Sequence, residues 1–224
     1  MSSLAPALPV FFPLVLALAA CGDSEAPSGP LPNPGVPAEQ AILPAPDSLR
    51  GAPGLRSVGP VSSVDSYASL AETVGADNLR DTLLAAGEGV SRPGLAVYPG
   101  TPEALVVFFE DPGTRRAVEE VVVAADDSPY RVQGLRIGMS LEEAQAVNGQ
   151  PFELTGLNWD YGGHSRDWGP DGRVSGNVTA VFQPRTRRAV PPDAQGDVTL
   201  DSDDEAWRGL GMHLVELRVG LSGV

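Results

Sequence analysis

The side chains best suited to chemistry lie close together between positions 159 and 168. This stretch supplies three aromatic rings, a carboxylate and an imidazole from Trp159, Asp160, Tyr161, His164 and Trp168. Aromatic rings can stack on a sugar ring or on an apolar side chain of a partner, and a nearby carboxylate can bind hydroxyls or amines. The same rings could instead form the core of a domain with few other aromatic residues. The sequence therefore leaves open both a partner surface and a core.

Three side chains in this region could ligate a divalent metal ion, namely Asp160, His164 and Asp167. A second acidic set could offer oxygen ligands to Ca²⁺ and consists of Asp197, Asp201, Asp203, Asp204 and Glu205. This second set lacks the glycine spacing of an EF-hand loop. Solvated positions on the surface of an acidic protein explain both sets better, so we predict neither a bound metal nor another cofactor.

The chain has only two histidines that could act in catalysis, His164 and His213. A Ser-His-Asp hydrolase would place one of them beside a serine on a strained turn, yet no G-x-S-x-G sequence occurs. The single cysteine, Cys21, ends an apolar run and has no catalytic partner nearby in the sequence. We therefore favour a non-enzymatic protein. The alternative is a metal- or carboxylate-dependent hydrolase of envelope polymers that would use Asp160, His164 and Asp167.

The charge balance argues against a nucleic-acid ligand. The chain has 15 basic and 29 acidic side chains, which gives a net charge of −14, and it contains no lysine. One basic group, Arg185, Arg187 and Arg188, is too small to reverse this balance and is typical of a solvated hairpin end. We therefore predict no nucleic-acid partner.

An uncharged, apolar segment opens the sequence. Residues 1–20 carry no charged side chain. Their apolar run from Val10 to Leu18 is too short to cross a hydrocarbon core, which needs about 20 apolar residues. These features predict a secretory signal peptide over residues 1–20.

The end of this segment, Leu18-Ala19-Ala20-Cys21, resembles the lipobox of bacterial lipoproteins. The resemblance implies that residues 1–20 are removed and that Cys21 carries two or three acyl chains such as palmitate, which suffice for stable anchoring in the cell membrane. A lipoprotein of this kind faces the periplasm, and Gly22 in place of aspartate after the cysteine favours the outer membrane. Because no other cysteine occurs, we expect no intramolecular disulfide.

The chain after Cys21 divides into a tether and a folded part. Nine of the 22 prolines lie between residues 22 and 60, among Gly, Ser, Ala and Asn and without apolar periodicity. We therefore predict a disordered tether over residues 21–60, which folding does not require, and one globular domain over residues 61–224. Such a module would bind an envelope protein or polymer while its lipid holds it at the membrane.

The pattern of the folded part predicts an α+β domain, mainly an antiparallel sheet with two or three short helices. One helix is expected over residues 66–74 before Gly75. Another begins at Ser140, with Glu143 completing a capping box and Gly149 ending the helix. Short apolar runs between turn sequences predict strands at residues 82–84, 95–98, 104–109, 118–125, 130–132, 178–182 and 214–221.

Two features of this pattern go beyond single elements. Ser69-Leu70 and Ser140-Leu141 lie 71 residues apart in similar contexts, which leaves open both an internal duplication and a chance similarity. The paired glycines within residues 159–164 indicate a bulge or a close backbone approach in a strand. We expect this bulge to build a shallow site next to the Ser140 helix, with Asp160 exposed to a partner.

Three segments of the sequence resemble a known family. Residues 135–143, 148–152 and 159–163 resemble bacterial lipoproteins that combine an IGMSL-E helix start, an NG-PF helix stop and a WDYGG strand. The first segment is also similar, more distantly, to the small BamE-type lipoproteins of outer-membrane protein assembly and to the β-lactamase-inhibitor-like fold. Because these relatives are not enzymes, the resemblance implies a non-enzymatic periplasmic module. The length of the chain and its tether depart from the BamE pattern.

Overall fold

The structure of the protein, a computed structural model, describes residues 55–221. The chain divides into the units Met1–Ala45 and Pro46–Val224, and all described residues belong to the second unit. Cys21, the predicted signal peptide and most of the predicted tether lie outside the described residues. Within residues 55–221, no helix is long and apolar enough to cross a membrane.

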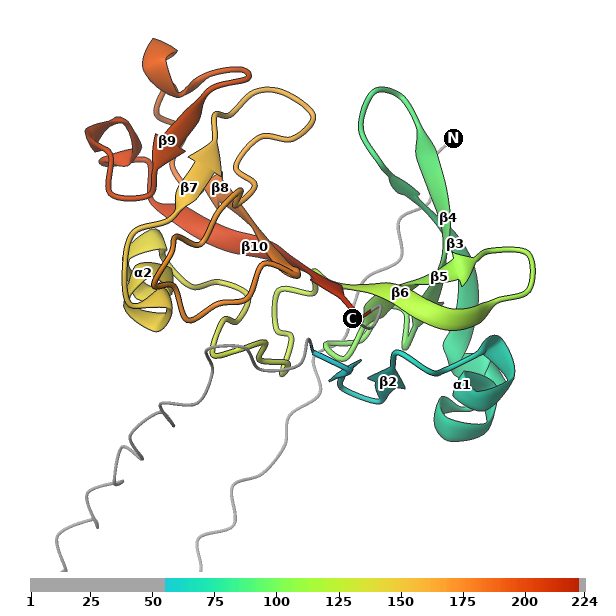
Figure 1. Ribbon diagram of the computed structural model, residues 1–224. Coiled ribbons are helices and arrows are strands. Elements are labelled where there is room, and N and C mark those ends of the chain that lie inside the picture. The colour runs from blue at the N-terminus through green and yellow to red at the C-terminus, as the bar shows by residue number, and fades with distance from the viewer. Residues whose placement is uncertain (1–54, 222–224) are drawn as a thin grey trace, which may run out of the picture. The chain divides into compact units, whose positions relative to one another are not determined.

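The described residues form an α+β fold dominated by an antiparallel sheet (Figure 1), which confirms the predicted fold class. The α-helices are α1 (Tyr67–Val74) and α2 (Leu141–Asn148), with 3₁₀ turns at Ala76–Asn78, Pro192–Ala194 and Glu205–Trp207. The strands are β1 (Ser57–Val58), β2 (Val61–Ser62), β3 (Leu79–Ala85), β4 (Ser91–Val97), β5 (Leu105–Asp111), β6 (Arg116–Val123), β7 (Glu153–Thr155), β8 (Val178–Pro184), β9 (Thr199–Asp201) and β10 (Met212–Gly220).

The main sheet has six strands in the order β3-β4-β5-β6-β10-β8. Strands β3 to β6 follow one another as antiparallel neighbours, so this part is a local meander. Strand β10 pairs with β6 on one side and with β8 on the other, which places Leu217 opposite both Val123 and Ala180. Strand β10, the last strand of the described residues, therefore joins the two parts of the sheet.

Both α-helices begin at a capping box. At α1 the Ser66 hydroxyl accepts from the Ser69 N–H and the Ser69 hydroxyl accepts from the Ser66 N–H. At α2, Ser140 and Glu143 make the same reciprocal pair, and Gly149 ends the helix in the left-handed conformation, as predicted. The proposed match of Ser69 with Ser140 is wrong by three residues, because Ser66 is the cap and Ser69 occupies the position of Glu143.

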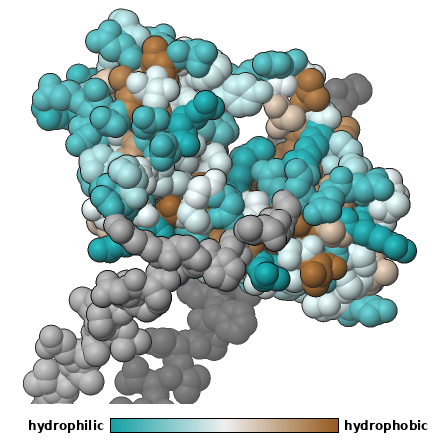
Figure 2. Space-filling model, viewed as in Figure 1, coloured by the Kyte–Doolittle hydropathy of each residue, from teal (hydrophilic) through white to brown (hydrophobic). Residues whose placement is uncertain are grey.

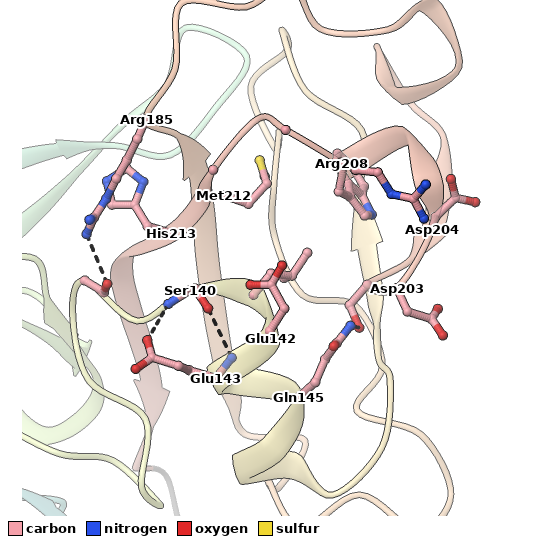
Figure 3. Close-up of a pocket in the computed structure, with 16 residues that line it drawn as sticks. Ser140, Glu142, Glu143, Gln145, Arg185, Asp203, Asp204, Arg208, Met212 and His213 are labelled. Carbon is pink, nitrogen blue, oxygen red and sulfur yellow. Dashed lines mark hydrogen bonds between the residues drawn. The ribbon is translucent and has the colours of Figure 1, made fainter.

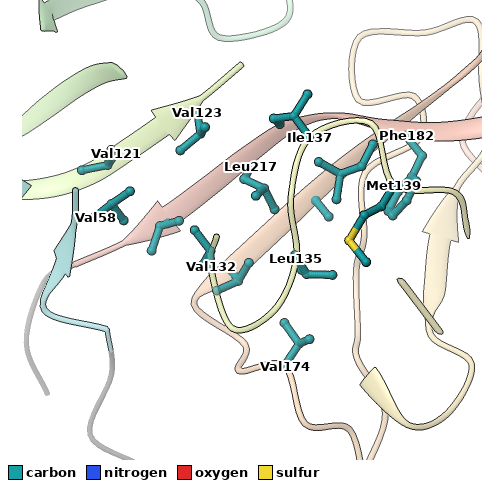
Figure 4. Packing of buried hydrophobic residues seen from close by; sticks show 14 of the residues in the cluster. Val58, Val121, Val123, Val132, Leu135, Ile137, Met139, Val174, Phe182 and Leu217 are labelled. Atoms are coloured by element: carbon teal, nitrogen blue, oxygen red, sulfur yellow. The ribbon is translucent and has the colours of Figure 1, made fainter. Parts of the chain in front are cut away.

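The irregular segment between β6 and α2, residues 124–140, covers one face of the main sheet beside β6 and β10 (Figure 4). It crosses the face without forming a strand, and every second or third side chain points into the core. The buried side chains of this segment are Val132, Leu135, Ile137 and Met139. They belong to the same hydrophobic cluster as Val121, Val123, Phe182 and Leu217 of the sheet. The apolar residues therefore follow the path of the segment over the sheet, with no regular period.

The strand predicted over residues 130–132 is wrong, because Val132 makes only an isolated bridge to Leu135. Val132 N–H donates to Leu135 O and Leu135 N–H donates to Val132 O, both at 2.9 Å. This pair closes a two-residue turn directly after Val132, so the backbone cannot continue as an extended strand.

The opposite face of the sheet carries a network of ion pairs. Arg92 on β4 pairs with Glu119 and Glu120 on β6. Arg218 on β10 pairs with Glu120 at 3.5 Å and with Glu216 at 2.6 Å. The network links three strands of the sheet and ends at Glu216 and Arg218, which take part in the site described below.

The folded part begins before the predicted boundary at residue 61. Val58 on β1 is only 5 % exposed and pairs with Val61 on β2. Leu55 is partly buried and packs against the core. Residues 55–60 therefore belong to the fold, although their composition resembles that of the tether.

Candidate functional site

Residues 159–164 form a turn, so the strand predicted here is wrong. The turn begins after Asn158, whose φ of 64° breaks the extended backbone that a strand needs. Inside the turn, Gly162 N–H donates to Trp159 O at 3.0 Å. The segment that contains Trp159 and Asp160 is therefore not extended.

Gly163 holds this turn against strand β8. Phe182 N–H donates to Gly163 O at 2.8 Å, and a Cβ atom on Gly163 would lie 2.0 Å from Phe182 O. Gly163 also has a φ of 77°, so only glycine satisfies both conditions. Thr155 is buried beneath the turn, where its hydroxyl donates to Tyr161 O and accepts from the His164 N–H. The close backbone approach predicted for the paired glycines is therefore present at Gly163.

The tip of the β3–β4 hairpin meets the same turn, and Figure 1 shows the hairpin rising beside the loop that follows β7. Glu88 N–H donates to Asp160 Oδ2 at 2.5 Å, between residues 72 positions apart in the sequence. Gly87 lies against the ring of Tyr161, since a Cβ atom at position 87 would lie 2.8 Å from that ring. The hairpin tip and the turn therefore form one wall.

A cavity of about 260 Å³ lies between the hairpin tip, the turn and the charged face of the sheet. We call it the hairpin pocket. Its walls come from residues 85–87 of the hairpin, from the turn, and from Gln183, Glu216 and Arg218 on β8 and β10. Figure 2 shows a hollow with hydrophilic residues along its edges in this part of the fold. Four of the five predicted partner-surface residues, Trp159, Asp160, Tyr161 and His164, line this one pocket.

The two aromatic rings of the turn belong to the pocket and are only partly buried. Trp159 and Tyr161 meet edge to face, with ring centres 5.4 Å apart. The Trp159 indole N–H donates to Gly156 O at 2.9 Å, which fixes the orientation of the ring. For these two residues the structure therefore favours a surface role over a core role.

His164 supplies the pocket with a neutral imidazole. Burial lowers the pKa of His164 below its usual value, and the nearby Arg218 charge acts in the same direction. Its Nδ1 is buried and has no hydrogen-bond partner among residues 55–221. Backbone carbonyls of Tyr161 and Gly162 act on the pKa in the opposite direction, but burial dominates, so the ring carries no charge at neutral pH.

Trp168 is a core residue, so its predicted place on the partner surface is wrong. The residue is 4 % exposed, and its ring centre lies 4.5 Å from that of Phe152. Its indole N–H donates to Val178 O at 2.8 Å, and the buried Asn148 side chain donates to Trp168 O at 2.8 Å. These contacts lock the ring between β8 and the end of α2, where no partner can reach it.

The candidate metal ligands are not assembled into a site. Asp160 turns to the hairpin tip, whereas Asp167 accepts from a backbone N–H two residues further along the chain. Asp204, within the acidic run of residues 197–205, accepts in the same way from a neighbouring N–H. In the described part of the chain, no three His, Cys, Asp or Glu side chains are placed to hold a metal ion.

The described residues also form no Ser-His-Asp arrangement. In such a triad a carboxylate accepts from the Nδ1–H of the histidine and orients the ring. The Nδ1 atoms of His164 and His213 are both buried without a partner in this range. Neither histidine is therefore oriented as the base of such a hydrolase.

A larger cavity of about 600 Å³, the helix pocket, lies beside the first turn of α2 (Figure 3). Its other walls come from the segment 202–213 and from Arg185. The sequence predicted a site next to the Ser140 helix, but built from residues 159–164, and none of those residues lines the helix pocket. The prediction therefore assigned to one site two features that belong to separate pockets: the Ser140 helix lines the helix pocket, and residues of the turn line the hairpin pocket.

Most charged groups around the helix pocket serve the local fold. Glu143 accepts from the Ser140 N–H, and Arg185 donates to Gly138 O at 3.1 Å (Figure 3). Arg208 pairs with a glutamate three residues earlier in the sequence. The hairpin pocket differs in its lining, because it combines polar groups with two partly exposed aromatic rings, those of Trp159 and Tyr161. We therefore place the candidate site in the hairpin pocket, although it is the smaller cavity.

The chain matches no protein-family model, no curated protein and no solved structure.

Proposed function

We propose that the protein is a lipid-anchored, non-enzymatic module of the cell envelope that binds an envelope protein or polymer in the hairpin pocket. The sequence Leu18-Ala19-Ala20-Cys21 and the proline-rich stretch that follows it support the anchor. Acyl chains on Cys21 would hold the module at the membrane, facing the periplasm, and Gly22 favours the outer membrane.

One observation carries the binding part of the proposal, namely the convergence of polar side chains from separate segments on one small cavity. Asp160 comes from the turn, Gln183 from β8, and Glu216 and Arg218 from β10. Trp159 adds an aromatic ring whose indole N–H is already fixed. Aromatic side chains with a few convergent polar groups are typical of ligand sites.

The same geometry supports binding over hydrolysis. Asp160 is engaged by the hairpin backbone, and Glu216 is ion-paired with Arg218 at 2.6 Å. His164 has no carboxylate partner on its buried Nδ1 within the described residues. A general base needs an oriented proton acceptor within reach of the substrate, and the His164 ring lacks, within residues 55–221, the carboxylate that would orient it.

The anchor is tested by changing Cys21→Ser in the full chain. We expect this change to abolish labelling by radioactive palmitate and to release the protein from the membrane fraction. Ser24→Ala, three residues away, is the matched control and should leave both properties unchanged. A Cys21→Ser protein that stayed quantitatively in the membrane fraction would contradict the anchor.

Binding is tested by capturing envelope components on the mature chain that carries Cys21→Ser. We expect a component that Asp160→Ala no longer retains and Asp167→Ala still retains. Asp167 is the matched control because it is an exposed aspartate of the same stretch that does not line the pocket. Equal capture by all three chains would contradict the site. Release of soluble fragments from envelope polymers that depended on Asp160 and His164 would instead support the hydrolase.

A further inference from the structure

The size of the hairpin pocket limits its ligand. Its volume is about 260 Å³, whereas the helix pocket has about 600 Å³. Pockets for drug-sized molecules span roughly 300–1,000 Å³. The hairpin pocket therefore has room for about one ring of a ligand and not for a folded peptide segment.

The unused polar atoms of the pocket include both acceptors and donors. Asp160 Oδ1, Gln183 Oε1 and Glu216 Oε2 accept no hydrogen bond from any residue in the range 55–221, although the other polar atom of each side chain is bonded. Arg218 Nη2 and the Tyr161 hydroxyl likewise have no partner in that range, while Arg218 Nε and Nη1 are engaged. Three acceptors and two donors are thus left for a ligand.

This mixture selects the chemistry of the ligand. An ammonium group only donates hydrogen bonds, and a carboxylate or phosphate group accepts them, whereas a hydroxyl does both. The pocket presents two carboxylates, from Asp160 and Glu216, beside the guanidinium of Arg218 and the neutral ring of His164. An anion would face the carboxylates and a cation would face Arg218, so a neutral ligand rich in hydroxyls fits best.

The aromatic side of the pocket suits a sugar ring. The edge-to-face pair of Trp159 and Tyr161 offers partly exposed apolar surface next to the polar groups. A pyranose ring has an apolar face of C–H groups and an edge of hydroxyls, so it can pack on an aromatic ring while its hydroxyls reach planar polar side chains. The pocket places both kinds of surface within one cavity.

We infer that the hairpin pocket binds one ring of a neutral saccharide. The inference rests on the proposed binding function and narrows its ligand from an envelope protein or polymer to a glycan. The polar contacts come from Asp160, Gln183, Glu216, Arg218 and the Tyr161 hydroxyl. Trp159 supplies the packing surface.

The test uses the mature chain with Cys21→Ser and the tetrasaccharide of N-acetylglucosamine as the neutral probe. Inorganic phosphate and spermidine serve as the anionic and cationic comparisons. Binding is followed by tryptophan fluorescence. Trp168 and Trp207 are 4 % and 5 % exposed, so a ligand in the pocket acts mainly on Trp159. We expect a saturable change with the saccharide and none with phosphate or spermidine.

Tyr161→Phe locates the binding. This change removes a hydroxyl that no residue within 55–221 bonds, so the thermal midpoint should stay unchanged while saccharide affinity falls about three- to tenfold. Tyr98→Phe is the matched control, because Tyr98 does not line the pocket. Saccharide binding that is unaffected by Tyr161→Phe would lie elsewhere and would overturn the inference.

The remaining outcomes separate the ligand class from the site. If no saccharide binds but capture of an envelope component still depends on Asp160, the ligand class is wrong and the proposed site stands. If both fail, the proposed function fails with the inference. Saturable binding of phosphate or spermidine that competes with the saccharide would overturn the preference for a neutral ligand.

Discussion

The two parts of the main sheet reach the same antiparallel pairing in different ways. In the meander β3–β6, each strand turns directly into the next, and alternating side chains set the register. Strands β8 and β10 are instead flanked by long irregular segments. These segments are held by contacts between residues that lie apart in the chain, such as the hydrogen bond from the Phe182 N–H to Gly163 O. Local turns are enough to specify a meander, whereas the irregular segments depend on these more distant contacts.

The largest expected effect comes from breaking the contact between Gly163 and Phe182. Gly163→Ala would place a Cβ atom 2.0 Å from Phe182 O at a φ of 77°, so the turn must leave β8. We expect a loss of more than about 4 kcal/mol in the free energy of unfolding, measured by urea denaturation. Gly176→Ala is the control, because nothing lies within 4 Å of that added Cβ atom. Equal stability of the two variants would show that the turn is not fixed by this contact.

The second prediction contrasts Trp159, which lies in the turn, with Trp168, which follows it in the chain. Trp168→Ala removes a buried ring and should cost about 3–5 kcal/mol. Trp159→Ala removes a partly exposed ring and should cost about 1–2 kcal/mol while abolishing saccharide binding. Thermal and urea denaturation of both variants check this order. A larger loss of stability for Trp159→Ala than for Trp168→Ala would mean that Trp159, and not Trp168, is the core residue.

The third prediction sharpens the boundary of the meander side. A chain that begins at Val61 loses β1 and the buried Val58, and burial of a valine contributes about 1.5–3 kcal/mol. We expect its thermal midpoint to lie about 5–10 °C below that of the mature chain. A chain that begins at Leu55 should keep the midpoint of the mature chain. A lower midpoint for that chain too would mean that residues before Leu55 pack on the domain.

The smallest expected effect is a dependence of stability on pH. The folded state holds the pKa of His164 below its usual value, chiefly by burial. The unfolded chain takes up a proton near pH 6.5, so below about pH 6.5 it binds more protons than the folded chain. The free energy of unfolding therefore falls as the pH falls through this range. His164→Gln should weaken this fall, measured as the urea midpoint at pH 8 and pH 5. An unchanged slope would contradict burial of the neutral ring.

Prediction from the sequence succeeded for the elements that interactions between neighbouring residues determine. Both helices, the Ser140–Glu143 capping box and the hairpin strands were accessible, because caps, turn residues and alternation act over a few neighbouring residues. The burial of Trp168 could not be predicted from the sequence, since it depends on contacts with Phe152 and Val178. The place of Leu55 and Val58 in the fold was missed for the same reason, because their partners lie elsewhere in the fold.

The candidate site was predicted only on one side. Residues 159–164 were singled out by their composition, but the opposing wall at residues 85–87 comes from a distant hairpin. Glu216 and Arg218 were missed as well. Their signal is present in the sequence, since both are polar residues within a strand whose alternate positions are apolar. Such a pattern indicates a polar sheet face but does not identify what covers that face.

The position of β10 in the chain determines the order in which the strands of the main sheet can pair. Its nine residues close the main sheet by pairing with β6 and β8, and β6 lies far away in the chain. Pairing across a long loop is slow, so the meander can form from local contacts well before the sheet closes. Until β10 is in place, the sides of β6 and β8 that it will occupy remain unpaired. Unpaired strand edges readily pair with other chains, so a chain in which β10 has not yet docked is prone to misassembly.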